Sequence, residues 1–493
     1  MTNNDNHSNH TLSTIKEKEQ DTIPFRIEFI KELLKDKMIE PMIDLDDTNT
    51  ENFIHIKKDS GNNYDDESCD TRIILNKKIY DFNKAISQIG GDLMYIKSGT
   101  TGHTFKGVIN GENDSYNYAV KVVAYPKKEK YGNINNAKRP ENAELMMIKL
   151  LSYFVINKQT PHIVLPIGTF NTNIQPFIDI VNNEKVIDKQ NEKYKNFVER
   201  YQNGEYYNKV SILISEWANR GDLLDFFRKN YRKFKLLHWK VFFFQILSVL
   251  AIIQYKFPSF RHNDMKANNI LVHKISKTNT SFTYKVVGKT YVVPNIGYII
   301  KLWDFDFACV PDIVNNNKVS SDWTKSINVT PEQNRYYDIH YFFNTLIKKG
   351  FFPQFMTEDY IPQEAKDFVN RIIPNKYKEG RYVHKRGRIL INDEYFTPDE
   401  ILKKDQFFDE FRKSSKQNNN INKSNNKSFG KSNNKLNNTN NIINQSNNTN
   451  DVINQLNNKS NNDCNDDNKK LQKTKNVKNE ISIDDLLMNY TDS

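Results

Sequence analysis

Two kinds of hydrophobic pattern follow one another along the chain. Beyond about residue 90, apolar and polar residues alternate in short runs, which is typical of β-strands. Farther along, apolar residues recur at the spacing of a helix face. The predicted strands are 94–96, 105–108, 118–123 and 212–214, and the predicted helices are 24–43, 140–156, 234–256, 335–349, 363–373 and 398–412. The chain therefore changes from a strand-rich part to a helix-rich part.

Polar segments mark the limits of an ordered domain, which we predict over 71–412. Before it, residues 1–70 form a polar extension that contains the helix of 24–43, and we expect residues 1–20 to be disordered. After it, residues 413–493 are dominated by Asn, Lys and Ser, and they cannot bury enough apolar surface to offset their ordering entropy. Two insertions are predicted inside the domain, a polar loop near 171–208 and an extended hairpin near 273–298.

Composition narrows the partners and the compartment. The net charge of +11 suits contact with phosphate groups, but no dense arginine cluster occurs, so we expect no specific nucleic-acid partner. The three cysteines, Cys69, Cys309 and Cys464, are too far apart for a zinc site and fit a reducing compartment. The first 20 residues lack the apolar core of a signal peptide, and the most apolar stretch, 241–253, is too short to span a bilayer. We therefore expect an intracellular protein with no membrane segment.

Two short segments combine the groups that phosphoryl transfer requires. The first contains Asp264, Lys266 and Asn269 on a loop that follows the long apolar helix. The second places Asp304 at the end of an apolar strand. We assign Asp264 to orient a hydroxyl, Lys266 to neutralise a phosphoryl group, and Asn269 and Asp304 to hold Mg²⁺. We interpret His262 as a structural residue packed beneath the loop rather than as a catalytic base.

A glycine-containing turn and a buried lysine lie upstream. Gly99 and Gly102 separate two predicted strands, and glycines let a backbone approach a triphosphate, although a plain hairpin turn has the same pattern. Lys121 lies in an apolar strand that we predict to be buried on both faces. A buried lysine requires a partner, and Glu144 on the next helix is the first choice, with Glu141 one turn away as the alternative.

The segment after the strand at 212–214 resembles a connector between two lobes. Glu216 stands at its start, where the backbone would face a nucleobase. Asp222 follows Gly221 at the beginning of a predicted helix, where it would face the ribose, cap the helix, or do both.

In their order along the chain, these elements resemble a eukaryotic-type protein kinase over about residues 90–412. The resemblance implies an α+β fold with a small antiparallel β lobe at about 71–215, which carries one helix, and a larger helical lobe at about 221–412. It also implies ATP as a substrate, with one or two Mg²⁺ ions. The implied nucleotide-binding residues are Lys97, Gly99, Gly102, Thr104, Lys121, Glu144, Glu216 and Asp222, and weaker matches are Thr330-Pro331-Glu332 at the end of the activation segment and Asp338 behind the catalytic loop.

Lys266 is the choice of serine/threonine kinases, so the resemblance favours a protein serine or threonine as the acceptor. The Asn-rich insertions are similar to those of kinases of giant DNA viruses, of the mimivirus kind, or of AT-rich protist genomes. A viral source implies action in the host cytoplasm or the virion. A small-molecule kinase of the choline or aminoglycoside type, and a catalytically inactive pseudokinase scaffold, are the alternatives.

Three positions depart from the kinase pattern. Lys97 replaces the first glycine of the phosphate loop, which loosens the phosphate cover or adds a charge. Asn263 replaces the arginine that pairs with a phosphorylated activation loop, which implies that loop phosphorylation is not required. Asp306 replaces the glycine after the metal-binding aspartate, and is either an additional ligand or a sign of lost activity.

Overall fold

The computed structural model describes residues 22–46, 75, 77–99, 102–110, 115–180, 191–319 and 321–412. The predicted disordered segments at 1–20 and 413–493, and residues 47–70 of the predicted N-terminal extension, lie outside the described residues.

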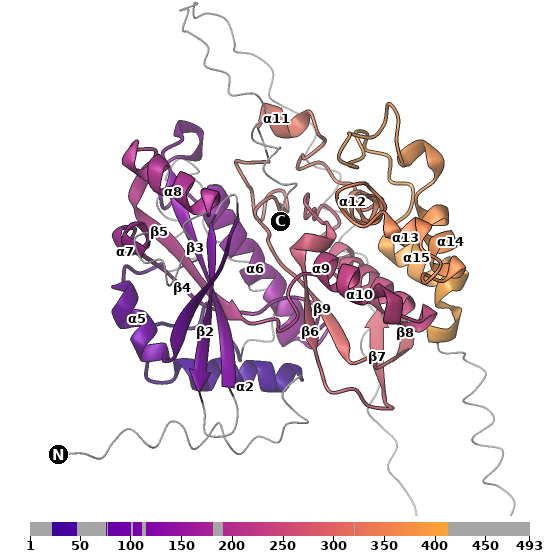
Figure 1. The fold of residues 1–493 in the computed structure, drawn as a ribbon, viewed down its shortest axis with the longest axis horizontal. Helices are drawn as coiled ribbons and strands as arrows, with labels where there is room; N and C mark the ends of the chain where they lie inside the picture. The colour runs from indigo at the N-terminus through magenta and orange to yellow at the C-terminus, as the bar shows by residue number, and fades with distance from the viewer. Residues whose placement is uncertain are drawn as a thin grey trace, which may run out of the picture. The chain divides into compact units, whose positions relative to one another are not determined.

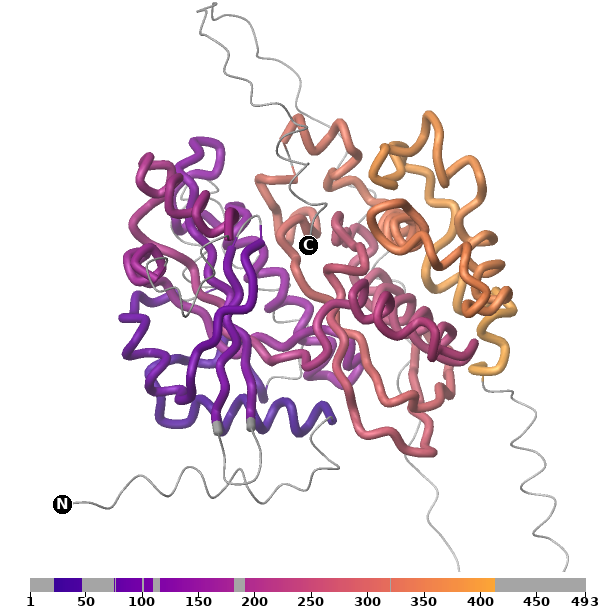
Figure 2. Tube along the Cα trace, viewed as in Figure 1, coloured from indigo at the N-terminus to yellow at the C-terminus, as the bar shows by residue number. Residues whose placement is uncertain are grey.

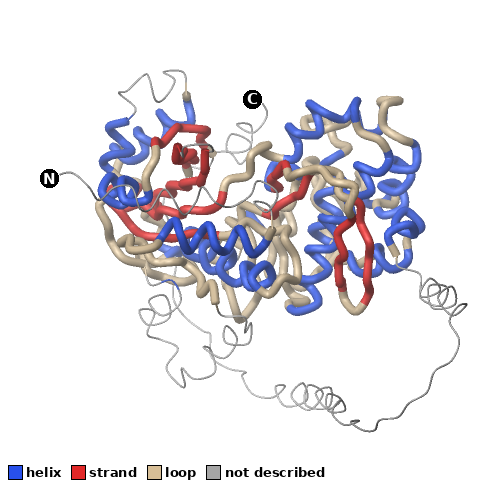
Figure 3. The backbone as a smooth tube through the Cα atoms, turned by 90° about the horizontal axis from the view of Figure 1, so that it is seen from below, coloured by secondary structure: helices blue, strands red, loops and turns tan. Residues whose placement is uncertain are grey.

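The described chain passes from a sheet-rich part into a helix-rich part, as the sequence pattern predicts (Figure 1). The strands are β1 (Asp92–Ser98), β2 (His103–Asn110), β3 (Ser115–Pro126), β4 (Pro166–Asn173), β5 (Tyr206–Glu216), β6 (Ile270–Lys274), β7 (Ser281–Val286), β8 (Lys289–Pro294) and β9 (Tyr298–Leu302). The α-helices are α2 (Ile23–Leu34), α5 (Phe82–Ile89), α6 (Pro140–Ile156), α7 (Gln175–Asp179), α8 (Glu192–Gln202), α9 (Leu223–Asn230), α10 (Leu236–Lys256), α11 (Asp322–Lys325), α12 (Tyr337–Leu346), α13 (Gln354–Thr357), α14 (Gln363–Ile372) and α15 (Pro398–Lys404). Figure 3 distinguishes helices, strands and loops by colour in a second view.

The β lobe is a five-stranded antiparallel sheet in the order β1-β2-β3-β5-β4. Its central strand β3 is buried from Tyr118 to Tyr125, because α6 and neighbouring segments cover the sheet on both sides. Pro140 stands at the first position of α6, where the missing N–H costs nothing. Such a doubly covered strand reads as a continuous apolar run, and a charged residue within it requires a buried partner.

The helical lobe is built around α10, which packs against α14, α15 and β9. Among the described residues, α10 alone is long and apolar enough to cross a membrane, with a mean hydropathy of 1.9 over its apolar window. Of that window, 78% is buried inside the protein, so α10 is the central helix of the lobe core. The hairpin predicted near 273–298 is present as β7 and β8, and β7 packs against α10.

The pairing of β6 with β9 brings the two candidate catalytic segments together. The strands are antiparallel, with Ile270 opposite Leu302. Asn269 immediately precedes β6, and Asp304 follows β9 by two residues, so both lie at the same end of the ribbon. The Trp303 N–H also donates to the Asn269 carbonyl, at 3.3 Å.

The structure differs from the sequence prediction at three places, two predicted segments and one helix that was not predicted. The N-terminal helix ends at Leu34 rather than at residue 43, and its buried side chains belong to the core of the β lobe rather than to a separate extension. The predicted polar loop at 171–208 contains α7 and α8, and α8 buries Tyr194 and Phe197 against the sheet. The amphipathic helix α5 escaped prediction because its eight residues are too few for a clear periodicity.

Candidate active site

The inner face of the β lobe presents a cross-strand row of polar residues. Lys97 on β1 lies opposite Thr104 on β2, which lies opposite Lys121 on β3. Residues opposite one another in antiparallel strands point to the same face of the sheet. The row therefore runs from the exposed Lys97 at the edge to the buried Lys121 at the centre.

The predicted glycine turn closes the end of β1 and β2. The Gly99 N–H donates to the Gly102 carbonyl at 2.8 Å, and the two intervening residues lie outside the described chain. A Cβ at position 102 would lie 2.5 Å from the Val122 carbonyl oxygen, so only glycine fits there. Gly99 has no such crowding, which means that its size is not dictated by packing.

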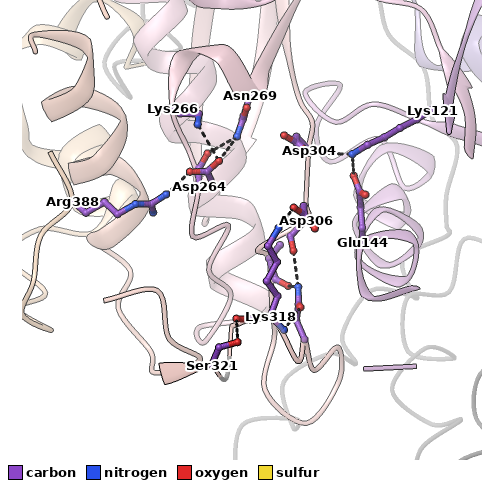
Figure 4. A network of polar contacts seen from close by, with 12 residues as sticks. Lys121, Glu144, Asp264, Lys266, Asn269, Asp304, Asp306, Lys318, Ser321 and Arg388 are labelled. Atoms are coloured by element: carbon purple, nitrogen blue, oxygen red, sulfur yellow. Dashed lines mark hydrogen bonds and ion pairs between the residues drawn. The ribbon is translucent and has the colours of Figure 1, made fainter. Parts of the chain in front are cut away.

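Lys121 joins the two lobes. Its Nζ lies 2.5 Å from Glu144 Oε1 on α6 and 3.1 Å from Asp304 Oδ1 after β9 (Figure 4). Burial lowers the pKa of Lys121, but Asp304 and Glu144 outweigh it and leave the pKa raised. Burial likewise opposes ionisation of Asp304, yet Lys121 holds its pKa at about 2, so this carboxylate is charged at neutral pH. Of the two candidate partners, Glu144 is the one in place, whereas Glu141 pairs with Arg139 at 2.8 Å.

The loop that carries Asp264 is held rigidly from behind. Asp338 on α12 accepts the backbone N–H groups of His262 and Asn263 at 2.8 and 2.9 Å. The ring of His262 contacts the Trp303 carbonyl at 3.0 Å, and so binds the loop to the segment of Asp304, consistent with the structural role expected for it. Asn263 adopts a left-handed conformation, with φ 62°, which asparagine tolerates better than most residues.

Asp264 is the centre of a buried polar cluster and is 8% exposed. Asn269 donates from Nδ2 to Asp264 Oδ2 at 2.8 Å, and Lys266 Nζ lies 3.3 Å from the same oxygen (Figure 4). The guanidinium of Arg388 pairs with the other oxygen, Oδ1. Burial raises the pKa of Asp264, but Lys266 and Arg388 outweigh it and hold the pKa below its usual value.

Sequence reasoning missed Arg388. It is 7% exposed, stacks on the Tyr341 ring at 4.0 Å and donates to the Asn263 carbonyl as well as to Asp264. It lies 124 residues beyond Asp264, inside a run of basic residues that is indistinguishable from a solvated surface loop. Only the packing of this loop against α12 brings it to the site.

We expect Arg388→Met to move the acid limb of the pH–rate profile to higher pH. Arg388 favours the ionised form of Asp264, so its removal raises the pKa of that carboxyl. The activity of Arg388→Met should therefore be lost at a higher pH on acidification than that of the wild type. Arg388→Lys keeps the positive charge, so its acid limb should stay close to that of the wild type. The measurement is kcat/KM against pH, with Arg381→Met, an exposed arginine of the same loop, as the control. An unmoved acid limb in a folded Arg388→Met protein would contradict this role.

Asp306, which replaces the usual glycine, is already paired. Lys318 forms an ion pair with its carboxylate and lies 3.9 Å from the centre of the Phe307 ring. Asn316 donates to the Asp306 carbonyl at 2.9 Å. The extra carboxylate therefore anchors the start of the activation segment.

The departure at Asn263 also has a structural account. Its side chain donates to the carbonyls of Phe307 and Thr330, at opposite ends of the activation segment. The neighbouring Arg261 donates to Asn328 and Thr330 and lies 3.8 Å from the centre of the Tyr337 ring. These contacts tie both ends of the segment to the catalytic loop, and independence from loop phosphorylation stays a prediction.

The side chains of Glu216 and Asp222, both predicted to be nucleotide-binding residues, have different partners. The side chain of Glu216 forms ion pairs with Arg26 and Lys301, so the nucleobase contact expected at this residue is left to its backbone. Burial opposes its ionisation, but these two cations hold the pKa of Glu216 at about 2. Asp222 caps α9 by accepting the Asp225 N–H at 3.0 Å, and this leaves its second carboxylate oxygen for a ligand.

Asn269 and Asp304 fit a magnesium ion by their chemistry. The amide group of Asn269 spends its nitrogen on Asp264, at 2.9 Å from the carbonyl and 2.8 Å from the carboxylate, and its oxygen is the remaining ligand atom. Asp304 gives Oδ1 to Lys121, which leaves Oδ2. One carboxylate and one amide oxygen suffice for Mg²⁺ when phosphates complete its coordination.

One family model and three known proteins are similar to this chain. Residues 131–385, just over half of the chain, match the family model of the poxvirus serine/threonine protein kinases. The chain is 50% identical over 395 residues to the provisionally named serine/threonine-protein kinase R400 of Acanthamoeba polyphaga mimivirus, an alignment that spans 78% of this chain and 80% of that protein. Serine/threonine-protein kinase 2 of fowlpox virus is 28% identical over 205 residues, covering 41% of this chain and 43% of the relative. The corresponding swinepox virus kinase is 30% identical over 137 residues, covering 27% and 28%. On the strength of the family model and the mimivirus relative, this chain belongs to the poxvirus serine/threonine protein kinase family and is a serine/threonine protein kinase.

Proposed function

We propose that the kinase binds ATP between its lobes and transfers the γ-phosphoryl group to a serine or threonine hydroxyl of a protein. The observation that supports this most directly is the bridge made by Lys121. Its ammonium contacts Glu144 from the β lobe and Asp304 from the helical lobe at once. In protein kinases this lysine–glutamate pair and the metal-binding aspartate must be in place together before transfer proceeds.

The nucleotide would lie along the inner face of the β lobe. The turn from Gly99 to Gly102 would cover the phosphates with backbone N–H groups, and Lys97 and Thr104 would line the same row as Lys121. The backbone of the connector 217–222 would face the nucleobase, and Asp222 would accept from the ribose.

Asp264 would accept or orient the hydroxyl proton of the acceptor. Both of its oxygens are positioned by neighbours, so little reorganisation is needed at the moment of transfer. Lys266, 3.3 Å from that carboxylate, would neutralise charge on the transferring group. Magnesium held by Asn269 and Asp304 would supply neutralisation of the charge on the phosphate oxygens.

The acceptor we propose is a protein, and the compartment is the interior of the infected host cell or the virion. The family to which the chain belongs supports both statements. A specific nucleic-acid partner is not part of the proposal.

The test is transfer of radiolabelled γ-phosphate from Mg-ATP to three kinds of acceptor: a generic basic protein, the kinase itself and a panel of small amino-alcohols. We expect label on protein serine and threonine only. Label confined to the amino-alcohols would favour a small-molecule kinase, and nucleotide binding with no transfer to any acceptor would indicate a pseudokinase.

A further inference from the structure

The N-terminal helix α2 inserts a buried arginine behind the connector between the lobes. Arg26 is 6% exposed. Its Nε donates to Glu216 Oε2 at 2.9 Å, and its terminal nitrogens donate to the carbonyls of Pro161 at 2.8 Å and Ile163 at 2.6 Å. The helix lies outside residues 131–385, which the family model covers.

Glu216, which Arg26 contacts, joins the connector to the strand that precedes Asp304. Glu216 is the last residue of β5 and the first step into the connector. Its carboxylate also receives Lys301, at 2.8 Å, three residues before Asp304. It accepts the Leu165 N–H as well, at 2.8 Å. The connector, the segment after α6 and the strand before Asp304 therefore share one buried carboxylate.

The segment after α6 is in turn joined to β9. The Leu302 N–H donates to the His162 carbonyl at 2.9 Å, and the Val164 N–H donates to the Leu302 carbonyl at 3.3 Å. Arg26 holds the carbonyls on either side of His162. One guanidinium thus connects three segments that meet behind the proposed nucleotide site, namely the end of β5, residues 161–165 and, through Glu216 and His162, β9.

Apolar packing fixes α2 in this place. Phe29 stacks on Tyr116 of β3 with ring centres 5.9 Å apart, and Ile30, Leu33 and Leu34 are buried in the core of the lobe. The helix contacts α6, which carries Glu144 (Figures 1 and 2). Burial of several large apolar side chains stabilises this packing, so α2 is an integral part of the lobe.

We propose that Arg26 is a positioning residue: by clamping Glu216 and the segment after α6, it holds the connector in the conformation that binds ATP. The proposal rests on the assignment of the connector as the nucleobase contact. It assigns to the N-terminal helix a role in nucleotide affinity.

The charges at this site make the proposal testable without destroying the fold. Arg26→Met leaves Glu216 paired with Lys301, so no buried charge is left uncompensated. Glu216→Gln instead removes the buried carboxylate that Arg26 and Lys301 share, and removal of one partner from a buried ion pair is strongly destabilising. Arg26→Met and Arg26→Lys are therefore the variants to use.

We expect Arg26→Met to raise the KM for ATP about tenfold, which corresponds to the loss of one charged anchor. The KM for the protein acceptor should stay unchanged. Arg26→Lys should give an intermediate KM for ATP, because it keeps the charge and one donor nitrogen. Lys31→Gln, on the same helix as Arg26, is the matched control, since it breaks a solvent-accessible ion pair with Asp46. Melting temperatures are measured alongside, and the kinetics are run well below all of them.

A lowered melting temperature with an unchanged KM for ATP in both Arg26 variants would reduce the arginine to a purely structural role and overturn the proposal. An equal rise in KM for ATP in Lys31→Gln would overturn it as well, since the effect would then belong to the helix as a whole. If the wild-type chain transferred no phosphate, the proposed function would fail, while direct titration of nucleotide binding in the same variants would still decide the role of Arg26.

Discussion

Replacing Asp264 by asparagine should reduce phosphoryl transfer by a factor of the order of 10²–10⁴ and leave ATP binding intact. Asparagine occupies nearly the same volume and can still accept from Asn269, but it cannot take the proton of the acceptor hydroxyl. The carboxylate contacts Asn269, Lys266 and Arg388, and it is not itself assigned to the nucleotide or the metal. Single-turnover transfer measures the loss, and nucleotide titration measures the retained binding.

The surroundings of Asp264 determine the controls. Neutralising it leaves Arg388 buried without its anion, so part of any effect could come from local destabilisation. The double variant Asp264→Asn with Arg388→Met removes both charges and should be as inactive as the single variant but more stable. Asp359→Asn, at an exposed position, should behave as wild type. Near-normal transfer by the double variant would show that Asp264 is not the group that orients the hydroxyl.

The site could be predicted from sequence wherever its residues are adjacent along the chain or follow a buried strand. Asp264, Lys266 and Asn269 occupy one loop, and the apolar strands on either side require that loop and Asp304 to meet at one end of a ribbon. Lys121 was predictable for a different reason: a lysine inside a fully apolar strand must find a carboxylate.

What could not be predicted depends on contacts across large separations in the chain. Arg388 reaches Asp264 over 124 residues, and Arg26 reaches Glu216 over 190. Nothing in the pattern around either arginine distinguishes it from a surface cation, since both follow from how a loop or a helix packs in three dimensions. Glu216 shows the same limit: its position at the end of β5 was evident from the sequence, but the ion pairs of its side chain with two distant cations were not.

The fold shows the same division. Long periodic elements such as α6 and α10 lie within two residues of their predicted bounds. By contrast, α8 lies in a stretch that is polar on average, and it buries only Tyr194, Phe197 and Val198, of which the two aromatic residues contact the sheet. A short amphipathic helix in a polar segment gains its stability from tertiary packing, which the local sequence does not reveal.

Replacing Asp304 by asparagine should abolish the dependence of nucleotide binding on Mg²⁺ and reduce transfer by about a thousandfold or more, because the metal contributes several kcal/mol of charge stabilisation. Asparagine is the informative substitution, since Asp304 has φ 61°, a left-handed conformation that asparagine tolerates and alanine does not. It also keeps an oxygen for Lys121, which remains paired with Glu144. Nucleotide titrations with and without Mg²⁺ measure the effect directly.

Asp306→Asn provides the control two residues away. Asp306 pairs with Lys318, so its neutralisation should loosen the start of the activation segment and leave the Mg²⁺ dependence of nucleotide binding unchanged. If Asp306→Asn abolished that dependence and Asp304→Asn did not, the metal would belong to the carboxylate that replaces the usual glycine, and Lys318 would be its counter-ion only in the absence of metal. We expect the loss of Mg²⁺ dependence in Asp304→Asn and not in Asp306→Asn. The oxygen of Asp304 that does not contact Lys121 is available to a ligand on the side of Asn269 (Figure 4).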